Sequence, residues 1–390
     1  MQRNISEIAK ELGIPAPSRN DVITTLLTDS RELEEGRGTL FFAIATSGND
    51  GHRYIGELLG RGVRNFVVTH VPEEYAEADA AFLVVPDVVK ALQRIGRRDG
   101  HFPGHLLGVT GSRGKTTLKE WIFQLMEPLG DVSRSPRSYN SQIGVPLSMW
   151  SLEPQAPLGI IEAGISRRGE MEALAECIAP DTVIVTNVGD AHAEGFANVA
   201  EKAREKMRLA KHPDVKSLIY RLGDENIEAA ADALGVTARR IRWSYDNPEA
   251  ELYIRREREN DLARLRYAFE GKENELAAPL ESEADFENAA AALAFMLLRG
   301  VAPEAIAERF RHLHKIGTRL NVTEGVNGSV LIEDSYTSDF SSLRPALHFA
   351  RRRQPAGHGL TLILSDLHHE NPDLEEMLSL IHISEPTRPY

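Results

Sequence analysis

A glycine-rich stretch is the part of this sequence best suited to bind phosphate groups. It reads Gly111-Ser112-Arg113-Gly114-Lys115-Thr116-Thr117 and follows the apolar run Leu106 to Val109. Between a strand and a helix, such a turn directs backbone N–H groups at an anion, the helix N-terminus adds partial positive charge, and Lys115 adds a full charge. Thr116 offers a hydroxyl to a magnesium ion. The pattern is the short Gly-x-x-Gly-Lys-Thr form, and the alternative is an ordinary glycine-rich turn with a solvated lysine. We predict an ATP site.

Two more polar side chains follow predicted strands and are expected near that turn. Glu162 ends the apolar strand Leu158 to Ile161, and His192 lies just beyond the strand Thr182 to Thr186. The carboxyl ends of parallel strands meet at one edge of a sheet, where phosphate sites also lie. A carboxylate and an imidazole at this edge predict magnesium ligands or groups next to them. The alternatives are a surface glutamate and a structural or solvated histidine.

The helix expected after His192 carries alternating charges over residues 201–208. Composition alone predicts a solvated face on which Lys202 and Lys206 form salt bridges at four-residue spacing. Asp190 and Asp224 are likewise expected to be surface carboxylates.

Composition indicates a soluble protein of several domains. The 390 residues are too many for one ordinary core, and 42% hydrophobic with 26% charged residues is typical of globular proteins. The net charge of −13 argues against a general nucleic-acid binder. The run Ala289 to Leu298 is about half a membrane span and predicts a buried helix. Cys177 is the single cysteine, which suits a reducing cytoplasm and predicts a buried structural thiol.

The order of predicted elements gives an α/β fold with three domains. We expect a small N-terminal α/β domain over residues 1–104 and a central domain with a mainly parallel sheet over residues 105–315. The start of a Rossmann-like C-terminal domain is expected over residues 316–377. Residues 378–390 continue no pattern and are expected to be a non-native tail.

Finer predictions can be made inside these domains. A helical stripe runs from Ile5 to Leu12, and alternation between residues 245 and 280 predicts antiparallel strands. A strong helix is expected from Phe286 to Arg299. In the third region, strands are expected at Ser329 to Ile332 and at Leu360 to Leu364.

Several motifs occur in the order seen in the Mur ligases, and the chain resembles that family over about residues 20 to 370. The central motifs are Gly111 to Thr117, Asn140-Ser141-Gln142-Ile143-Gly144-Val145-Pro146-Leu147, Glu162-Ala163-Gly164-Ile165-Ser166 and Thr186-Asn187-Val188-Gly189-Asp190-Ala191-His192. Segments similar to the family's uridine-nucleotide domain are Thr28-Asp29-Ser30-Arg31, Leu40-Phe41-Phe42-Ala43 and Asp50-Gly51-His52. Asp334-Ser335-Tyr336 with Ser342-Leu343 resembles the start of its C-terminal domain.

The resemblance implies an ATP-dependent amide ligase of peptidoglycan precursor synthesis. The motifs are most similar to those of members that add D-alanyl-D-alanine to UDP-N-acetylmuramoyl-tripeptide through an acyl phosphate. The segment Phe286 to Ala292 looks most like variants fused ahead of an alanine racemase. The implied ligands are ATP, Mg²⁺ and the two substrates, in the cytoplasm, with no nucleic acid and no membrane span. The alternatives are a folylpolyglutamate synthase-like ligase, which lacks the leading domain, and a binding-only fragment with little turnover.

The same resemblance assigns residues to the nucleotide and its metals. Lys115 and the amides of the glycine-rich turn would hold the ATP phosphates. Thr116 and Glu162 would hold one Mg²⁺, and His192 would hold a second.

Three further residues are assigned on the ATP side. The family's carbamoylated lysine comes fourteen residues after the motif histidine, which selects Lys206 rather than Lys202. Carbamoylation turns the cation into an anion, so that a buried position near Mg²⁺ becomes favourable. Asn288 matches an adenine-side asparagine, although Glu287 stands where a histidine is usual. Arg319 matches an arginine near the hinge to the C-terminal domain that contacts the nucleotide.

Four residues are assigned to the peptide and uridine substrates. Asn140 and Ser141 lie in the loop implied to contact substrate, and Ser141 replaces an asparagine often seen there. Ser30 and His52 are the candidates for the uridine nucleotide.

Overall fold

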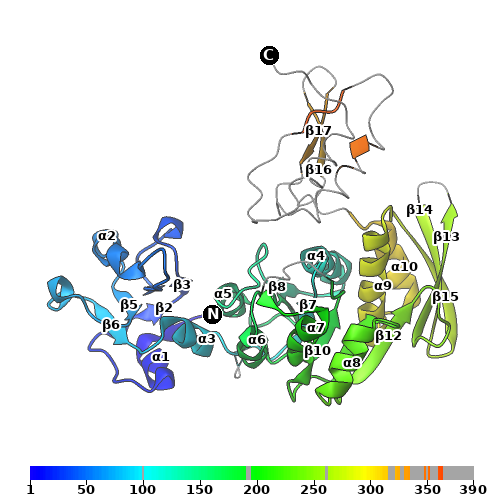
Figure 1. Cartoon of the computed structure of the whole chain (residues 1–390). Helices are drawn as coiled ribbons and strands as arrows, with labels where there is room; N and C mark the ends of the chain where they lie inside the picture. The colour runs from blue at the N-terminus through cyan, green and yellow to red at the C-terminus, as the bar shows by residue number, and fades with distance from the viewer. Residues whose placement is uncertain are drawn as a thin grey trace. The chain divides into compact units, whose positions relative to one another are not determined.

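A computed structural model describes most of the chain up to residue 333 (Figure 1). The described residues are 1–98, 101–189, 195–259, 262–314, 321–325, 329–333, 347, 350, 351 and 359–362. The chain divides into two units, Met1–Leu313 and His314–Tyr390. The motifs predicted to carry chemistry lie mainly in the first unit.

The N-terminal part of the first unit is built on four parallel strands. In the order β3-β4-β5-β6 they are Thr25–Leu27, Thr39–Phe42, Asn65–Val68 and Ala81–Val84. Alternate residues of a strand point to opposite faces, so this sheet has two cores. Helices α1 (Ile5–Leu12) and α3 (Val88–Ile95) cover one face, and α2 (Ile55–Gly60) covers the other. The predicted first helix is confirmed. A short antiparallel pair, β1 (Arg3–Asn4) with β2 (Val22–Ile23), completes this part.

The second sheet has nine strands in the order β15-β14-β13-β12-β11-β10-β7-β9-β8. In chain order, strands β7 to β15 are His105–Thr110, Val132–Arg134, Leu158–Glu162, Thr182–Val185, Ser217–Arg221, Arg239–Ser244, Leu252–Glu259, Leu262–Phe269 and Lys272–Ala278. Neighbours from β8 to β13 are parallel, whereas β13, β14 and β15 are antiparallel. The α/β fold, the mainly parallel sheet and the antiparallel strands between residues 245 and 280 are therefore confirmed.

Helices cover this sheet and supply its core. They are α4 (Lys115–Met126), α5 (Gly144–Ser151), α6 (Glu170–Ile178), α7 (Val199–Met207), α8 (Glu225–Ala233), α9 (Glu283–Leu298) and α10 (Pro303–Arg311). The alanine-rich helix α9 is buried over Asn288–Met296, which confirms the predicted buried helix. In the part of the chain that the structure describes, no helix has the length and apolar character needed to cross a membrane. Cys177 on α6 is fully buried, as predicted, in a core that also contains residues of α5, α7 and α8.

Helix α5 connects the four-stranded and the nine-stranded sheet of the first unit. Its Trp150 packs into the core formed by α1, α3 and the four-stranded sheet, and the indole Nε1 donates to the Thr24 carbonyl at 3.0 Å. Gln93 on α3 donates to the side-chain oxygen of Gln142 at 2.8 Å. The predicted boundary near residue 104 lies in the segment between the end of α3 and the start of β7.

The described part of the second unit is small. Strands β16 (Asn321–Glu324) and β17 (Val330–Glu333) form an antiparallel pair, and β17 confirms the predicted strand near Ser329. The strand predicted from Leu360 to Leu364 is wrong over residues 360–362, which the structure describes outside any strand. An apolar run becomes a strand only with a hydrogen-bonded neighbour, and the sequence of the run does not specify one. The predicted tail, residues 378–390, lies outside the described residues.

His105 sits at the start of β7, at the opposite end of the strand from the glycine-rich turn. Its Nε2 lies 3.0 Å from the Thr182 hydroxyl, and its Nδ1 lies 3.2 Å from the Arg299 guanidinium. Burial, together with the Arg299 charge, lowers the pKa of His105 from 6.5 to about 4. The folded protein therefore holds this imidazole neutral.

Stability is expected to fall as the pH drops from about 6.5 towards 4, because the unfolded chain takes up the His105 proton first. The shift corresponds to roughly 3 kcal/mol at most, and solvent screening of a partly exposed group reduces it to about 1–2 kcal/mol. Urea unfolding at pH 7.5 and pH 4.5 measures the loss. His105→Gln should show a smaller difference between the two pH values than the wild type, and equal losses would contradict the assignment.

Candidate active site

The glycine-rich turn forms the strand–turn–helix predicted from its sequence. It connects β7 to α4, and Gly111 and Gly114 have φ angles of 141° and 81°. A Cβ on Gly111 would lie 1.9 Å from the Thr186 hydroxyl oxygen, and one on Gly114 would lie 2.8 Å from the Asn288 side-chain oxygen. Only glycine fits at these two positions. The tight packing brings the backbone of the turn close to β10 and α9.

The segment after β10 fixes the conformation of the turn. The Ser112 N–H donates to the Asn187 carbonyl at 2.8 Å, and the Arg113 N–H donates to the Asn187 side-chain oxygen at 3.1 Å. The Thr186 hydroxyl donates to the Arg113 carbonyl at 2.6 Å. Helix α4 begins at Lys115 directly after the turn, and no side chain caps its first turn in the described structure. Its first N–H groups and its positive end are therefore available to an anion.

Three lysines gather at this turn. The ammonium groups of Lys115 and Lys206 both donate to the Gly111 carbonyl, at 3.1 and 3.0 Å, and that of Lys202 donates to the Gly189 carbonyl at 2.5 Å. Lys202 and Lys206 are 2% and 3% exposed. Burial, with the charges of Lys115 and Lys202, holds the pKa of Lys206 well below its usual value. Three lysine side chains thus meet at the turn that is predicted to hold a polyphosphate.

The predicted solvated helix face is wrong for Lys202 and Lys206. Helix α7 lies against the glycine-rich turn, so both side chains are buried and both ammonium groups donate to backbone carbonyls. Charge spacing along a sequence does not reveal such partners, because every residue has a backbone carbonyl. The carbonyl of Gly111 lies 95 residues before Lys206, and that of Gly189 lies 13 residues before Lys202.

Glu162 lies at the C-terminal end of β9 with both carboxylate oxygens engaged. The Thr116 hydroxyl donates to its Oε2 at 2.8 Å, and the Asn140 amide donates to its Oε1 at 2.6 Å. The carboxylate is 1% exposed. The structure therefore brings together the hydroxyl and the carboxylate predicted to bind Mg²⁺, and it adds Asn140 as the group that orients the carboxylate.

The residues present fit a magnesium-bound nucleotide. Hydroxyl and carboxylate oxygens are the donors that Mg²⁺ accepts, usually with waters completing the shell. The described residues contain no cluster of three or more His, Cys, Asp or Glu side chains that could hold a metal alone. The predicted set instead combines Thr116, Glu162 and Lys206. Its histidine, His192, lies outside the described residues, as does Arg319.

The remaining predicted residues fall into different surroundings. Asn288 is 6% exposed and faces Gly114 across the turn, whereas Thr117 is half-buried in the first turn of α4. The Ser141 hydroxyl accepts the Gly144 N–H at 3.1 Å and so supports the start of α5. Ser30 is buried at the start of a short 3₁₀ turn, where the Arg61 guanidinium donates to its carbonyl at 2.8 Å.

Both ring nitrogens of His52 are engaged within the N-terminal part. Its Nδ1 lies 2.7 Å from the Asp50 carboxylate, and its Nε2 accepts the Thr69 N–H at 3.1 Å. His52 also stacks on His70 with ring centroids 4.5 Å apart. The ring thus fixes the Asp50-Gly51-His52 loop, and a direct nitrogen contact to a uridine nucleotide would require replacing one of these bonds.

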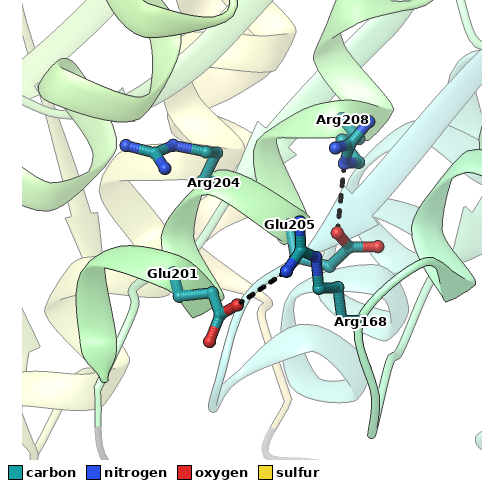
Figure 2. A pocket seen from close by; sticks show the side chains of 5 residues that line it. All are labelled: Arg168, Glu201, Arg204, Glu205 and Arg208. Atoms are coloured by element: carbon teal, nitrogen blue, oxygen red, sulfur yellow. Dashed lines mark hydrogen bonds and ion pairs between the residues drawn. The ribbon is translucent and has the colours of Figure 1, made fainter. Parts of the chain in front are cut away.

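A pocket of about 120 Å³ lies along α7. Figure 2 shows its lining residues, Arg168, Glu201, Arg204, Glu205 and Arg208. Arg168 pairs with Glu201 at 3.7 Å, and Arg208 pairs with Glu205 at 3.0 Å. None of the five was predicted to take part in the chemistry. The buried Glu205 has a structural role, because it accepts the N–H groups of Gly169 and Met171 and so fixes α7 against the start of α6.

Residues 109–296 match the family model described as the Mur ligase middle domain. This central part of the chain is a Mur ligase middle domain. A Bacillus subtilis protein named UDP-N-acetylmuramoyl-tripeptide–D-alanyl-D-alanine ligase is 26% identical over 379 residues, which cover 96% of this chain and 80% of that protein. A Synechocystis protein of the same name is 35% identical over 208 residues, 53% of this chain and 45% of its own length. The Synechocystis match thus spans less than half of that relative.

Solved structures of Mur ligases share the fold. MurF from Acinetobacter baumannii superposes with a TM-score of 0.78 at 22% identity, over 91% of this chain and 77% of that one. MurF from Thermotoga maritima in complex with ADP gives 0.70 at 22% identity, over 83% and 74%. A folate-bound FPGS complex gives only 0.54 at 14% identity. The Mur ligase fold predicted from the motifs is confirmed.

Three residues at the site were not predicted in their observed roles. Asn140 contacts Glu162, Lys202 holds the Gly189 carbonyl, and Glu205 holds the start of α6. A signal for the last two exists in the sequence, because Lys202, Glu205 and Lys206 share one face of α7 with spacings of three and four residues. The contact of Asn140 has no comparable local signal.

Proposed function

We propose that this Mur ligase forms an amide bond between UDP-N-acetylmuramoyl-tripeptide and D-alanyl-D-alanine at the expense of ATP. The observation that carries the proposal is the Thr116–Glu162–Asn140 contact beside a glycine-rich phosphate turn. The names of the Bacillus and Synechocystis relatives supply the substrates. A cytoplasmic location belongs to the same proposal, because the single cysteine suits a reducing compartment. An alanine racemase module fused behind this one stays a prediction.

The chemistry requires activation of a carboxylate. The terminal carboxylate of the tripeptide takes the γ-phosphoryl group of ATP, which gives an acyl phosphate and ADP. The amine of D-alanyl-D-alanine then attacks the acyl carbon, loses a proton, and expels inorganic phosphate from a tetrahedral intermediate. Each step gathers negative charge at one place, so catalysis depends on positioning and charge neutralisation.

The residues assigned to the site can meet these demands. Lys115 and the N–H groups of the turn would hold the ATP phosphates at the N-terminus of α4. Thr116 and Glu162 would hold one Mg²⁺, which supplies neutralising charge to the transferring phosphoryl group. His192 and a carbamoylated Lys206 would hold a second, and Asn140 orients Glu162. Asn288, Arg319, Ser30, His52 and Ser141 keep their assigned nucleotide and substrate roles as part of this proposal.

Phosphate release tests the proposal directly. The chain is mixed with ATP, Mg²⁺ and UDP-N-acetylmuramoyl-tripeptide, with or without D-alanyl-D-alanine, and free phosphate and the pentapeptide product are measured. Dipeptide-dependent release is the expected result. Binding of both nucleotides without release would favour a binding-only role for this chain, and release with a folate in place of the muramoyl peptide would overturn the substrate assignment.

Lys206 is expected to carry a carbamate. A neutral amine reacts with CO₂, and burial near Lys115 and Lys202 favours the neutral amine. ¹³C NMR of the chain in ¹³C-bicarbonate should show one carbamate signal that Lys206→Met removes, together with a loss of turnover of about a hundredfold.

Lys202→Met is the matched control on the same helix. This variant should keep the carbamate signal, because the carbamate is expected on Lys206. A signal that Lys202→Met removes and Lys206→Met retains would reverse the assignment.

A further inference from the structure

Lys119 lies on α4 one turn beyond the glycine-rich turn, and the chemistry above gives it no role. Its side chain is 0% exposed. The ammonium group donates to the Ser135 carbonyl at 2.8 Å and to the Arg137 carbonyl, and it lies 3.1 Å from the Glu120 carboxylate. The other oxygen of Glu120 accepts from Arg134 at 2.8 Å. A buried ammonium is costly without such partners, so its position and theirs are fixed together.

The two carbonyls belong to the segment that leads from β8 to Asn140. The buried Ser135 hydroxyl accepts the Glu162 N–H at 3.3 Å at the start of the segment. Asn140 donates to the Glu162 carboxylate at its end. Between them, Arg137 has a φ of +46°, a left-handed conformation that a non-glycine residue adopts only when its surroundings impose it. Lys119 supplies that constraint at the middle of the segment.

We propose that Lys119 is a positioning residue that fixes Asn140, and through it the Glu162 carboxylate, relative to the glycine-rich turn. Thr116 and Lys119 lie one turn apart on α4. Thr116 donates to Glu162 directly, and Lys119 holds the segment whose Asn140 donates to the other oxygen of Glu162. The proposal deepens the ligase function and rests on it, because Glu162 is the residue whose orientation matters there.

Hydrogen exchange tests the structural half of the proposal without any substrate. Lys119→Met keeps the apolar stem and removes the ammonium group. The hydrogen-bonded amides of Ser135 and Tyr139 should exchange about tenfold faster or more in this variant, while those of β10 stay unchanged. Lys90→Met, at a lysine whose side chain is 81% exposed, is the control. Unchanged exchange at Ser135 and Tyr139 would overturn the proposal.

A double-mutant cycle tests the functional half. Lys119→Met should lower kcat about tenfold with a smaller change in the KM for ATP, and Lys119→Met with Asn140→Ala should lose no more than Asn140→Ala alone. Losses that multiply would show that Lys119 does not act through Asn140. Should Lys119→Met fail to fold, the shorter Lys119→Gln, which keeps a donor, is measured in the same two assays. A wild-type chain without ligase activity would refute the proposed function, and the exchange result would still decide the role of Lys119.

Discussion

Lys115→Ala is expected to lower ATP-dependent phosphate release by about a thousandfold. Lys115 is the lysine that begins α4, and its ammonium group lies within 3.1 Å of the Gly111 carbonyl, at the mouth of the turn. A preorganised cation beside transferring phosphate stabilises charge that develops in the transition state, and its removal is not replaced by water at the same place. The side chain is not part of the apolar core, so folding should be affected little.

The measurement combines turnover with nucleotide binding. ADP affinity, measured by calorimetry, should fall together with turnover, while the urea midpoint stays close to the wild-type value. Lys10→Ala, on an exposed position of α1, is the control for loss of a positive charge. Turnover within tenfold of the wild type would show that Lys115 does not contact the phosphates.

Glu162→Gln is expected to reduce turnover by about a hundredfold to a thousandfold. The substitution keeps the shape of the side chain but removes the negative charge proposed to bind Mg²⁺. It also places an amide between two groups that both donate to the carboxylate, Thr116 and Asn140, so one hydrogen bond is lost whichever way the amide turns. Oxygen ligands without charge bind Mg²⁺ more weakly.

A magnesium titration separates this effect from general damage. Half-maximal ADP binding should require much more Mg²⁺ in Glu162→Gln than in the wild type. Glu153→Gln, on an exposed carboxylate before β9, should leave the titration unchanged. The same Mg²⁺ requirement in all three proteins would place the metal elsewhere.

The parts of the site that one segment specifies could be predicted from the sequence. The turn from Gly111 to Thr117 is such a part, because glycine spacing, the apolar strand before it and the helical pattern after it all lie within twenty residues. Glu162 could be placed because a strand end predicts its edge of the sheet. Their contact through Thr116 then follows from the order of β7 and β9, which are neighbours.

Contacts between distant segments could not be predicted in the same way. The amide of Asn140 reaches Glu162 only because the segment after β8 bends back over β9, and nothing local in its sequence states that path. The burial of Lys202 and Lys206 was predicted wrongly from composition for a related reason. Lys206, for example, donates to the Gly111 carbonyl 95 residues earlier, and a main-chain carbonyl is a partner that no residue type signals.

Trp150 couples the unfolding of the four-stranded sheet to that of the nine-stranded sheet. Its helix begins four residues after Asn140, yet the indole is buried in the core of the four-stranded sheet. Removing that ring from the core of the four-stranded sheet would expose this core and leave α5 packed only on the nine-stranded sheet. The two sheets should therefore melt in a single transition. A ligand bound at either sheet then raises the stability of both, because each must unfold for the other to do so. The loop that carries Asn140 is thus thermodynamically linked to the loops of Ser30 and His52 through α5 and its Trp150, without any contact between their ligands.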